Sequence, residues 1–153
     1  MDMLIRLYAV ADRPPPPDVT VRRAMAYERT EVLECIQGWF PHTPGWVDEC
    51  ALAFARQPVA CHIAIEEGKL VGFAVYDSTY RGFFGPIGVD PTSQSRGVGS
   101  ALCIATLNAM SAVGYAYAVI GGVGAPEFFA RLGATPIDGS DPGPYWRIET
   151  KKG

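Results

Sequence analysis

Residues 85–100 read GPIGVDPTSQSRGVGS, and they are the most informative stretch of the chain. A predicted strand ends in their first part, a polar loop follows, and a predicted helix begins at Val98. The free backbone N–H groups and the positive dipole end of that helix face the loop, which favours a bound anion. Gly97 and Gly99 let the backbone approach a phosphate closely, and Arg96 adds a positive charge. The stretch therefore predicts a phosphate-binding loop.

Three kinds of phosphate loop compete for this pattern. A Walker A loop requires a lysine after its second glycine, and none follows here. A dinucleotide fingerprint requires GxGxxG, whereas residues 97–102 read GVGSAL. The third kind, Q/R-x-x-G-x-G/A, binds the pyrophosphate of coenzyme A, and Gln94, Gly97 and Gly99 match it.

On either side of this loop, alternating and 3.6-residue hydrophobic patterns predict strands and helices in turn. Helices are predicted to begin at Glu28, after Gly45, at Val98 and at Pro126, and strands are predicted over 3–10, 19–22, 59–65, 70–76, 83–89, 115–120, 134–137 and 145–148. Pro86 gives no ladder hydrogen bond, so the strand 83–89 is expected to carry a bulge. The crossover from 83 to 120 predicts one right-handed parallel unit in an otherwise antiparallel sheet, and residues 115–120 are expected to be buried on both faces.

The length of 153 residues fits a single domain, 1–153. Residues 1–18 are expected to form an N-terminal strand and a proline-rich connector, and residues 19–148 the core. The run Pro14–Pro17 is interpreted as a stiff spacer. A proline-rich ligand for a partner protein is the alternative interpretation.

Composition excludes several classes of function. Thirteen basic and sixteen acidic residues give a net charge of −3, which argues against nucleic acid as a partner. The apolar runs are shorter than the ~20 residues that span a bilayer, and MDMLIRLYAV lacks the features of a signal peptide. We therefore expect a cytoplasmic protein with no membrane contact.

The cysteines form no metal-binding pattern. They include no CxxC pair, and only two histidines accompany them, so no metal is expected; they are Cys35, Cys50, Cys61 and Cys103. We interpret them as reduced, core-filling thiols, with a reactive thiol at Cys61 as the alternative.

Taken with its flanks, the loop resembles that of the GCN5-related N-acetyltransferases (GNAT). The resemblance covers roughly residues 19–148, keeps the order of elements and includes PEFFARLGA, residues 126–134. It implies an α/β (α+β) fold with a mixed, mostly antiparallel central sheet, one parallel and splayed strand pair, and helices on both faces. It also allows a homodimer, which many relatives form.

The resemblance further implies acetyl-CoA as the acyl donor. The pantetheine arm would lie between strands 83–89 and 115–121, against Ile87, Gly88 and Val89. The pyrophosphate would lie on the loop and first helical turn, and Phe129 would flank the thioester. The loop residues that this implies are Gln94, Ser95, Arg96, Gly97, Val98, Gly99 and Ser100.

The chain departs from the family at the group that protonates the leaving thiolate. Many members carry a tyrosine in a Phe-Tyr pair where this chain has Phe128-Phe129, and an asparagine where it has 121–123, GGV. Catalytic candidates are therefore sought at the edge where the acceptor would enter, and they are Tyr80 and His62. His62 fits equally a satisfied core histidine.

An aromatic group near the predicted turn between the first two helices has two interpretations. In the first interpretation, this group and Tyr145 form the wall of a substrate pocket. In the second, the group is a hydrophobic staple between the two helices. The residues are Trp39, Phe40 and Trp46.

The sequence thus predicts an acyl-CoA-dependent N-acyltransferase. It would move acetyl from acetyl-CoA to a primary amine of a small molecule by direct transfer. The alternative, motivated by the missing tyrosine, is a non-catalytic acyl-CoA-binding or regulatory module.

Overall fold

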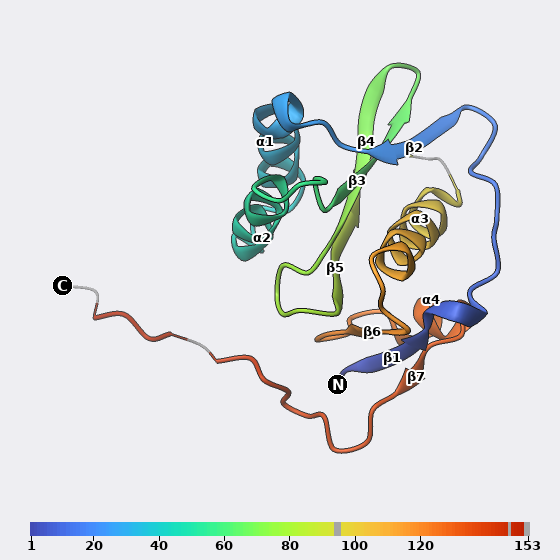
Figure 1. Ribbon diagram of the computed structural model, residues 1–153. Helices are drawn as coiled ribbons and strands as arrows, with labels where there is room; N and C mark the ends of the chain where they lie inside the picture. The colour runs from blue at the N-terminus through green and yellow to red at the C-terminus, as the bar shows by residue number, and fades with distance from the viewer. Residues whose placement is uncertain (94–95, 147, 152–153) are drawn as a thin grey trace.

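A computed structural model describes residues 1–93, 96–146 and 148–151 of the chain (Figure 1). The strands form one seven-stranded sheet in the order β2-β3-β4-β5-β6-β1-β7. They are β1 (Met3–Arg6), β2 (Val19–Arg23), β3 (Cys61–Glu66), β4 (Lys69–Tyr76), β5 (Phe83–Val89), β6 (Tyr117–Ile120) and β7 (Thr135–Pro136). The β5–β6 pair is parallel and the others are antiparallel, as the sequence predicts.

Helices cover both faces of this sheet. They are α1 (Arg29–Trp39), α2 (Gly45–Phe54), α3 (Val98–Ala112) and α4 (Pro126–Arg131), with 3-10 turns η1 (Leu7–Ala9) and η2 (Ala26–Glu28). Figure 1 shows α1 and α2 on one side of the central strands and α3 on the other. Successive residues of β3 confirm this arrangement, because Cys61 contacts Cys50 of α2 while His62 faces Thr106 of α3. None of the helices in the described residues is long and apolar enough to cross a membrane.

A bulge in β5 separates it from β6. On the β4 side, Ala74 pairs with Ile87 and Tyr76 with Phe84, so two residues of β5, Gly85 and Pro86, stand opposite one residue of β4. On the β6 side, pairing is confined to Phe83 and Phe84. The parallel pair therefore meets where β5 begins and β6 ends. The chain segments diverge after Phe84 and Ile120, which opens the sheet between its two halves.

The N-terminal strand lies inside the sheet. β1 pairs with β6 on one side and with β7 on the other, and Met3, Ile5 and Leu7 are buried. The connector that follows runs past the start of α3, where Pro16 is the nearest contact for a Cβ added at Gly97. The N-terminal strand is thus an internal strand of the sheet.

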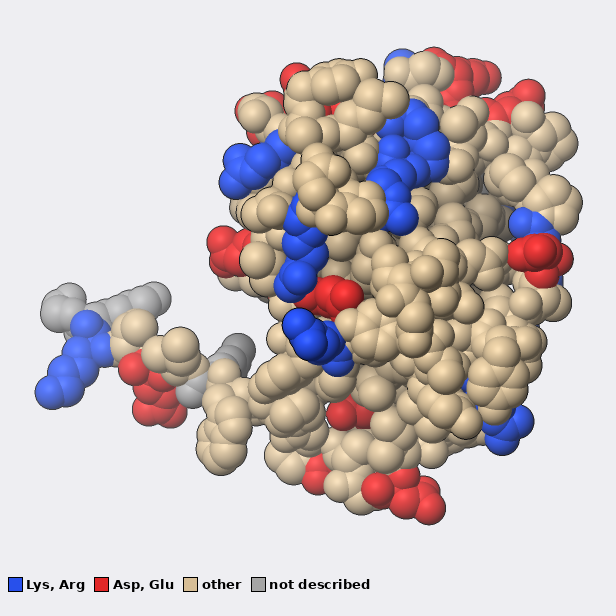
Figure 2. All heavy atoms as spheres, viewed as in Figure 1, with Lys and Arg blue, Asp and Glu red and all other residues tan. Residues whose placement is uncertain are grey.

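Two sequence predictions are wrong. Tyr145, Trp146 and Ile148 form no strand, and Trp146 and Ile148 belong to a C-terminal segment that projects from the body of the molecule (Figures 1 and 2). β1 occupies the position next to β6 in the sheet. The edge strand beyond β1 is the short β7, in which Pro136 has no N–H group to donate to a further strand. β6 is also not buried on both faces: Tyr117 is 48% exposed and packs edge-on against Tyr8.

Candidate functional site

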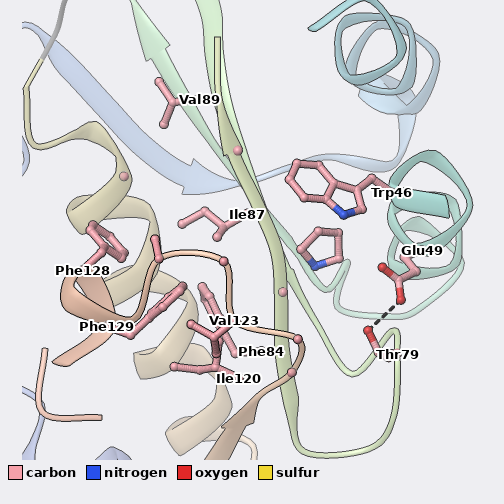
Figure 3. Close-up of a pocket in the computed structure, with 18 of the residues that line it drawn as sticks. Trp46, Glu49, Thr79, Phe84, Ile87, Val89, Ile120, Val123, Phe128 and Phe129 are labelled. Atoms are coloured by element: carbon pink, nitrogen blue, oxygen red, sulfur yellow. Dashed lines mark hydrogen bonds between the residues drawn. The ribbon is translucent and has the colours of Figure 1, made fainter. Parts of the chain in front are cut away.

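A pocket of about 540 Å³ lies where β5 and β6 diverge (Figure 3). β5 forms its spine from Phe84 to Val89, and residues 120–125 after β6 form the opposite wall. Figure 3 shows Trp46, Glu49 and Thr79 on one side of β5. Phe128 and Phe129 of α4 lie on the other side, so the pocket extends through the sheet rather than along one face.

The side of the pocket nearer α3 and α4 holds several predicted cofactor residues. Ile87, Gly88, Val89, Gly99 and Phe129 all line it. Among the described residues, no strand pairs with β5 on the β6 side beyond Phe84, so that backbone edge is open to an extended ligand. A ligand amide group could pair there as an added strand would.

The start of α3 forms the end of the predicted phosphate loop. Gly97 caps the helix with φ of +86°, a left-handed conformation that glycine adopts without strain. Arg96 and Gly97 are exposed, Val98 is buried and Ser100 is half-buried, and these residues do not line the pocket. The backbone N–H groups of the first helical turn and the dipole of α3 favour an anion here. Gln94 and Ser95, the other predicted members, lie outside the described residues.

Apolar rings close the α4 side of the pocket. Phe129 is buried and packs edge-on against Phe84 with ring centroids 6.1 Å apart, and Phe128 lies edge-on against Phe129 at 5.0 Å. Neither ring carries a proton donor. A proton for a leaving group must therefore come from elsewhere in the pocket or from solvent.

The predicted aromatic group divides between the pocket and the core. Trp46 lines the pocket, whereas Trp39 and Phe40 do not. Phe40 packs between Trp46 and Phe73, with centroids 5.0 and 6.4 Å away, and it is the nearest neighbour of a Cβ added at Gly88. The ring of Phe40 thus supports β5 from behind, and Trp46 offers a face to a ligand.

Polar groups at the α2 end of the pocket were not singled out from sequence. Glu49 lines the pocket, and one of its carboxylate oxygens accepts a 2.6 Å hydrogen bond from the hydroxyl of Thr79. In the sequence, Glu49 shows only an acidic residue near the start of a helix, a common feature with no catalytic meaning. Only the packing of α2 beside the opening in the sheet reveals its position.

Tyr145 lines the same pocket from the C-terminal segment. Its hydroxyl donates a 3.3 Å hydrogen bond to Asp2, a buried carboxylate that also accepts from the N–H of Gly122. Burial, followed by the negative charges of Asp2 and Glu49, raises the pKa of Tyr145 to about 12. The hydroxyl therefore keeps its proton at neutral pH.

Neither catalytic candidate from the sequence lines the pocket. Tyr80 is 47% exposed, packs against Phe83, and donates a 3.1 Å hydrogen bond to the carbonyl of Pro144, the residue before Tyr145. His62 is buried under α3, with its Nδ1 3.4 Å from the Thr106 hydroxyl. Burial and the neighbouring Arg23 lower the pKa of His62 to about 4. The structure thus places His62 in the core.

The cysteines are set apart from this site. Cys50 and Cys61 are buried with their sulfur atoms 3.9 Å apart. The hydrogen bond with Cys50 and burial raise the pKa of Cys61 well above its usual value, which disfavours the reactive thiolate. Across the part of the chain that the structure describes, no group of three or more His, Cys, Asp or Glu side chains could hold a metal ion.

Comparison with known protein families identifies the family of the chain. The model of the acetyltransferase (GNAT) family matches residues 24–134, which is most of the chain. The chain therefore belongs to the GNAT acetyltransferase family. A search of curated proteins gave no match.

Solved structures show the same fold at low sequence identity. A GCN5-related N-acetyltransferase from Sphaerobacter thermophilus is 20% identical with a TM-score of 0.65, over 88% of this chain and 47% of that one. One from Kribbella flavida is 18% identical with a TM-score of 0.64, over 88% and 53%. A GNAT family acetyltransferase from Brucella melitensis, solved with acetyl-CoA, is 18% identical with a TM-score of 0.57, over 72% and 80%. The chain thus spans about half the length of the first two structures.

Proposed function

We propose that this protein is an acetyl-CoA-dependent N-acyltransferase that transfers acetyl directly to a primary amine of a small molecule. The observation that carries the proposal is the pocket that passes through the diverging β5–β6 pair. Its two sides open toward different helices, which suits two substrates that meet at the strand between them. Membership of the family and the acetyl-CoA complex of the Brucella relative support the choice of donor.

The donor would enter on the α3 and α4 side. The open edge of β5 at Ile87, Gly88 and Val89 would pair with the amide groups of the pantetheine arm. The loop residues Gln94–Ser100 would receive the pyrophosphate, with the N–H groups at the start of α3 and the side chain of Arg96 as donors. Backbone N–H groups of β5 near the opening would polarise the thioester carbonyl.

Transfer then requires one bond to form and one to break. The uncharged amine nitrogen attacks the thioester carbon, the carbon–sulfur bond breaks, and the sulfur leaves with the electron pair. The nitrogen loses a proton and the sulfur gains one, so the products are the N-acetyl amine and free CoA. The protein supplies position and polarisation, and none of its side chains forms a covalent intermediate.

Tyr145 is the group that we assign to protonate the departing sulfur. It lines the pocket, it keeps its proton at neutral pH, and Phe129 offers none. Tyr80 would act as a positioning residue, because its hydrogen bond to the Pro144 carbonyl holds the segment that carries Tyr145. Solvent would take the proton of the amine, because His62 is buried under α3 and does not line the pocket. Solvent would also return a proton to Tyr145 after the sulfur has left.

The experiment is a thiol-release assay with purified protein, acetyl-CoA and a panel of primary amines. The proposal predicts that free CoA appears only when an amine is present and that mass spectrometry finds one N-acetyl amine for each CoA released. Binding of acetyl-CoA without amine-dependent release would instead favour a non-catalytic acyl-CoA-binding module.

A further inference from the structure

Charge is distributed unevenly in the pocket, and its negative end lies beside α2. Trp46 and Glu49 are three positions apart on α2 and so lie on the same helix face. Figure 3 shows both side chains on one side of β5, with Thr79 next to Glu49. Among the described residues, no lysine or arginine lines the pocket.

The carboxylate of Glu49 is fixed in place but has no ionic partner among the described residues. Thr79 donates to one of its oxygens and thereby orients it. The side chain of Glu49 is half-buried. A partly desolvated carboxylate without a countercharge is unfavourable, and a cationic ligand would relieve that cost.

Two further features favour a cation at this end. The indole of Trp46 lines the pocket beside Glu49, and aromatic faces attract ammonium groups. The buried carboxylate of Asp2 accepts a hydrogen bond from the hydroxyl of Tyr145, another residue of the pocket lining. A second carboxylate therefore lies next to the pocket.

The cation is best understood as a group other than the reacting nitrogen. An amine must be uncharged to attack the thioester, and a carboxylate paired with an ammonium group stabilises its charged form. Pairing Glu49 with the reacting nitrogen would oppose the reaction. Pairing it with a second cationic group of the same molecule would instead orient the free amine toward β5.

We infer that the acceptor is a diamine-type molecule, whose second, unreactive cationic group binds between Glu49 and Trp46. This inference rests on the proposed function, because it names the acceptor class of the same site. Acceptors with a carboxylate or an uncharged group in place of the second ammonium are expected to be poor substrates.

The experiment compares acceptors that differ only at the far end. The probes are 1,3-diaminopropane, 1,4-diaminobutane and 1,5-diaminopentane, each beside the amino alcohol and the amino acid of equal length. The wild type should use the best diamine at a kcat/KM at least about tenfold above its two analogues, since hydrogen bonds between charged groups are strong.

Glu49→Gln removes the negative charge of the side chain and keeps its size and shape. It should lower kcat/KM for the diamine by about tenfold to a hundredfold, mainly through KM, and leave the amino alcohol nearly unchanged. Glu34→Gln makes the same change on an exposed position of α1 and should have no effect. Thermal melting of both variants checks that they fold.

Several results would overturn the inference. One is a wild-type preference for the amino alcohol or the amino acid. Another is an equal fall in kcat for all acceptors in Glu49→Gln, which would assign Glu49 to proton transfer. If no amine releases CoA, the proposed function fails, and calorimetric titration of 1,4-diaminobutane into the CoA-saturated protein decides the inference alone. Binding that Glu49→Gln abolishes would support a cation site, and absent or unchanged binding would reject it.

Discussion

At the scale of single residues, the pocket has Phe129 where many family members have a tyrosine, and it contains another tyrosine, Tyr145. Phe129 cannot donate a proton, while Tyr145 lines the pocket and donates a hydrogen bond to Asp2. The pKa of Tyr145, raised to about 12, keeps the hydroxyl protonated throughout the neutral range. A proton donor can therefore be supplied by the C-terminal segment.

Tyr145→Phe removes this hydroxyl and keeps the ring. We expect kcat to fall by ~10²-fold, the low end of the usual range for general acid catalysis, because a thiolate is a tolerable leaving group. The affinity for acetyl-CoA should stay within about twofold. Tyr27→Phe, at an exposed tyrosine of η2, is the matched control. Unchanged kcat in Tyr145→Phe would remove Tyr145 from the mechanism.

The lowered pKa of His62 is expected to make the stability of the protein depend on pH. Its pKa is about 4 in the folded protein and about 6.5 when unfolded, so between these values the unfolded chain binds the proton preferentially. The free energy of unfolding should therefore fall as pH drops from 6.5 to 4, by roughly 3 kcal/mol in all. Urea unfolding at pH 7.5, 5.5 and 4.5 measures this loss.

His62→Gln should flatten this pH dependence, whatever it does to stability at neutral pH. His42→Gln, at an exposed histidine, should preserve it. The same slope in His62→Gln as in the wild type would show that other groups cause the loss.

At the scale of elements, β1 connects parts of the chain that are far apart in sequence. It lies between β6 and β7, and Asp2 just before it hydrogen-bonds to both Gly122 and Tyr145. The N-terminal strand thus positions two segments that line the pocket. Packing of this strand is expected to affect both stability and activity.

Ile5→Ala tests the strand directly, because Ile5 is 1% exposed in the core. The truncation should lower the free energy of unfolding by about 2–5 kcal/mol, through lost burial and the cavity left behind. Arg6→Ala, at the exposed neighbouring position, should change it by less than about 0.5 kcal/mol. Denaturant unfolding of both variants provides the measurement, and equal small effects would show that β1 is not part of the core.

Elements bounded by strong local signals were predicted well from the sequence. β5 matches its predicted range, and α3 begins at the predicted Val98 after the left-handed Gly97. The bulge at Pro86 followed from a missing donor. The place of β1 could not be predicted, since a four-residue strand carries no signal for its neighbours.

The site was predicted unevenly for a similar reason. The resemblance to the family implies Ile87, Gly88, Val89 and Gly99 as donor-site residues, and these residues line the pocket. Glu49 and Thr79 come from separate segments that meet only after the sheet and α2 have packed. Residues within one motif can therefore be predicted to lie on one pocket, whereas the meeting of Glu49 with Thr79 requires the tertiary structure.

At the scale of the whole molecule, the divergence of β5 and β6 would let one sheet serve the two substrates that we propose. α3 and α4 cover the side assigned to acetyl-CoA, and α2 covers the side assigned to the amine. On the face shown in Figure 2, acidic and basic side chains are both scattered over the surface. Selectivity for the acceptor is thus expected to arise inside the pocket.

The most direct test of the central claim is a calorimetric titration of acetyl-CoA into the wild type and Gly99→Val. The nearest side-chain neighbours of a Cβ at Gly99 would be Phe128 and Val89, at 3.8 and 3.9 Å, which is ordinary van der Waals contact. The variant should therefore fold while its branched side chain enters the pocket. Gly38→Val, where a Cβ meets nothing within 4 Å, is the control. We predict micromolar binding by the wild type and Gly38→Val, and at least tenfold weaker binding by Gly99→Val. Absence of binding by the wild type, or equal binding by a folded Gly99→Val, would contradict an acetyl-CoA site between β5 and β6.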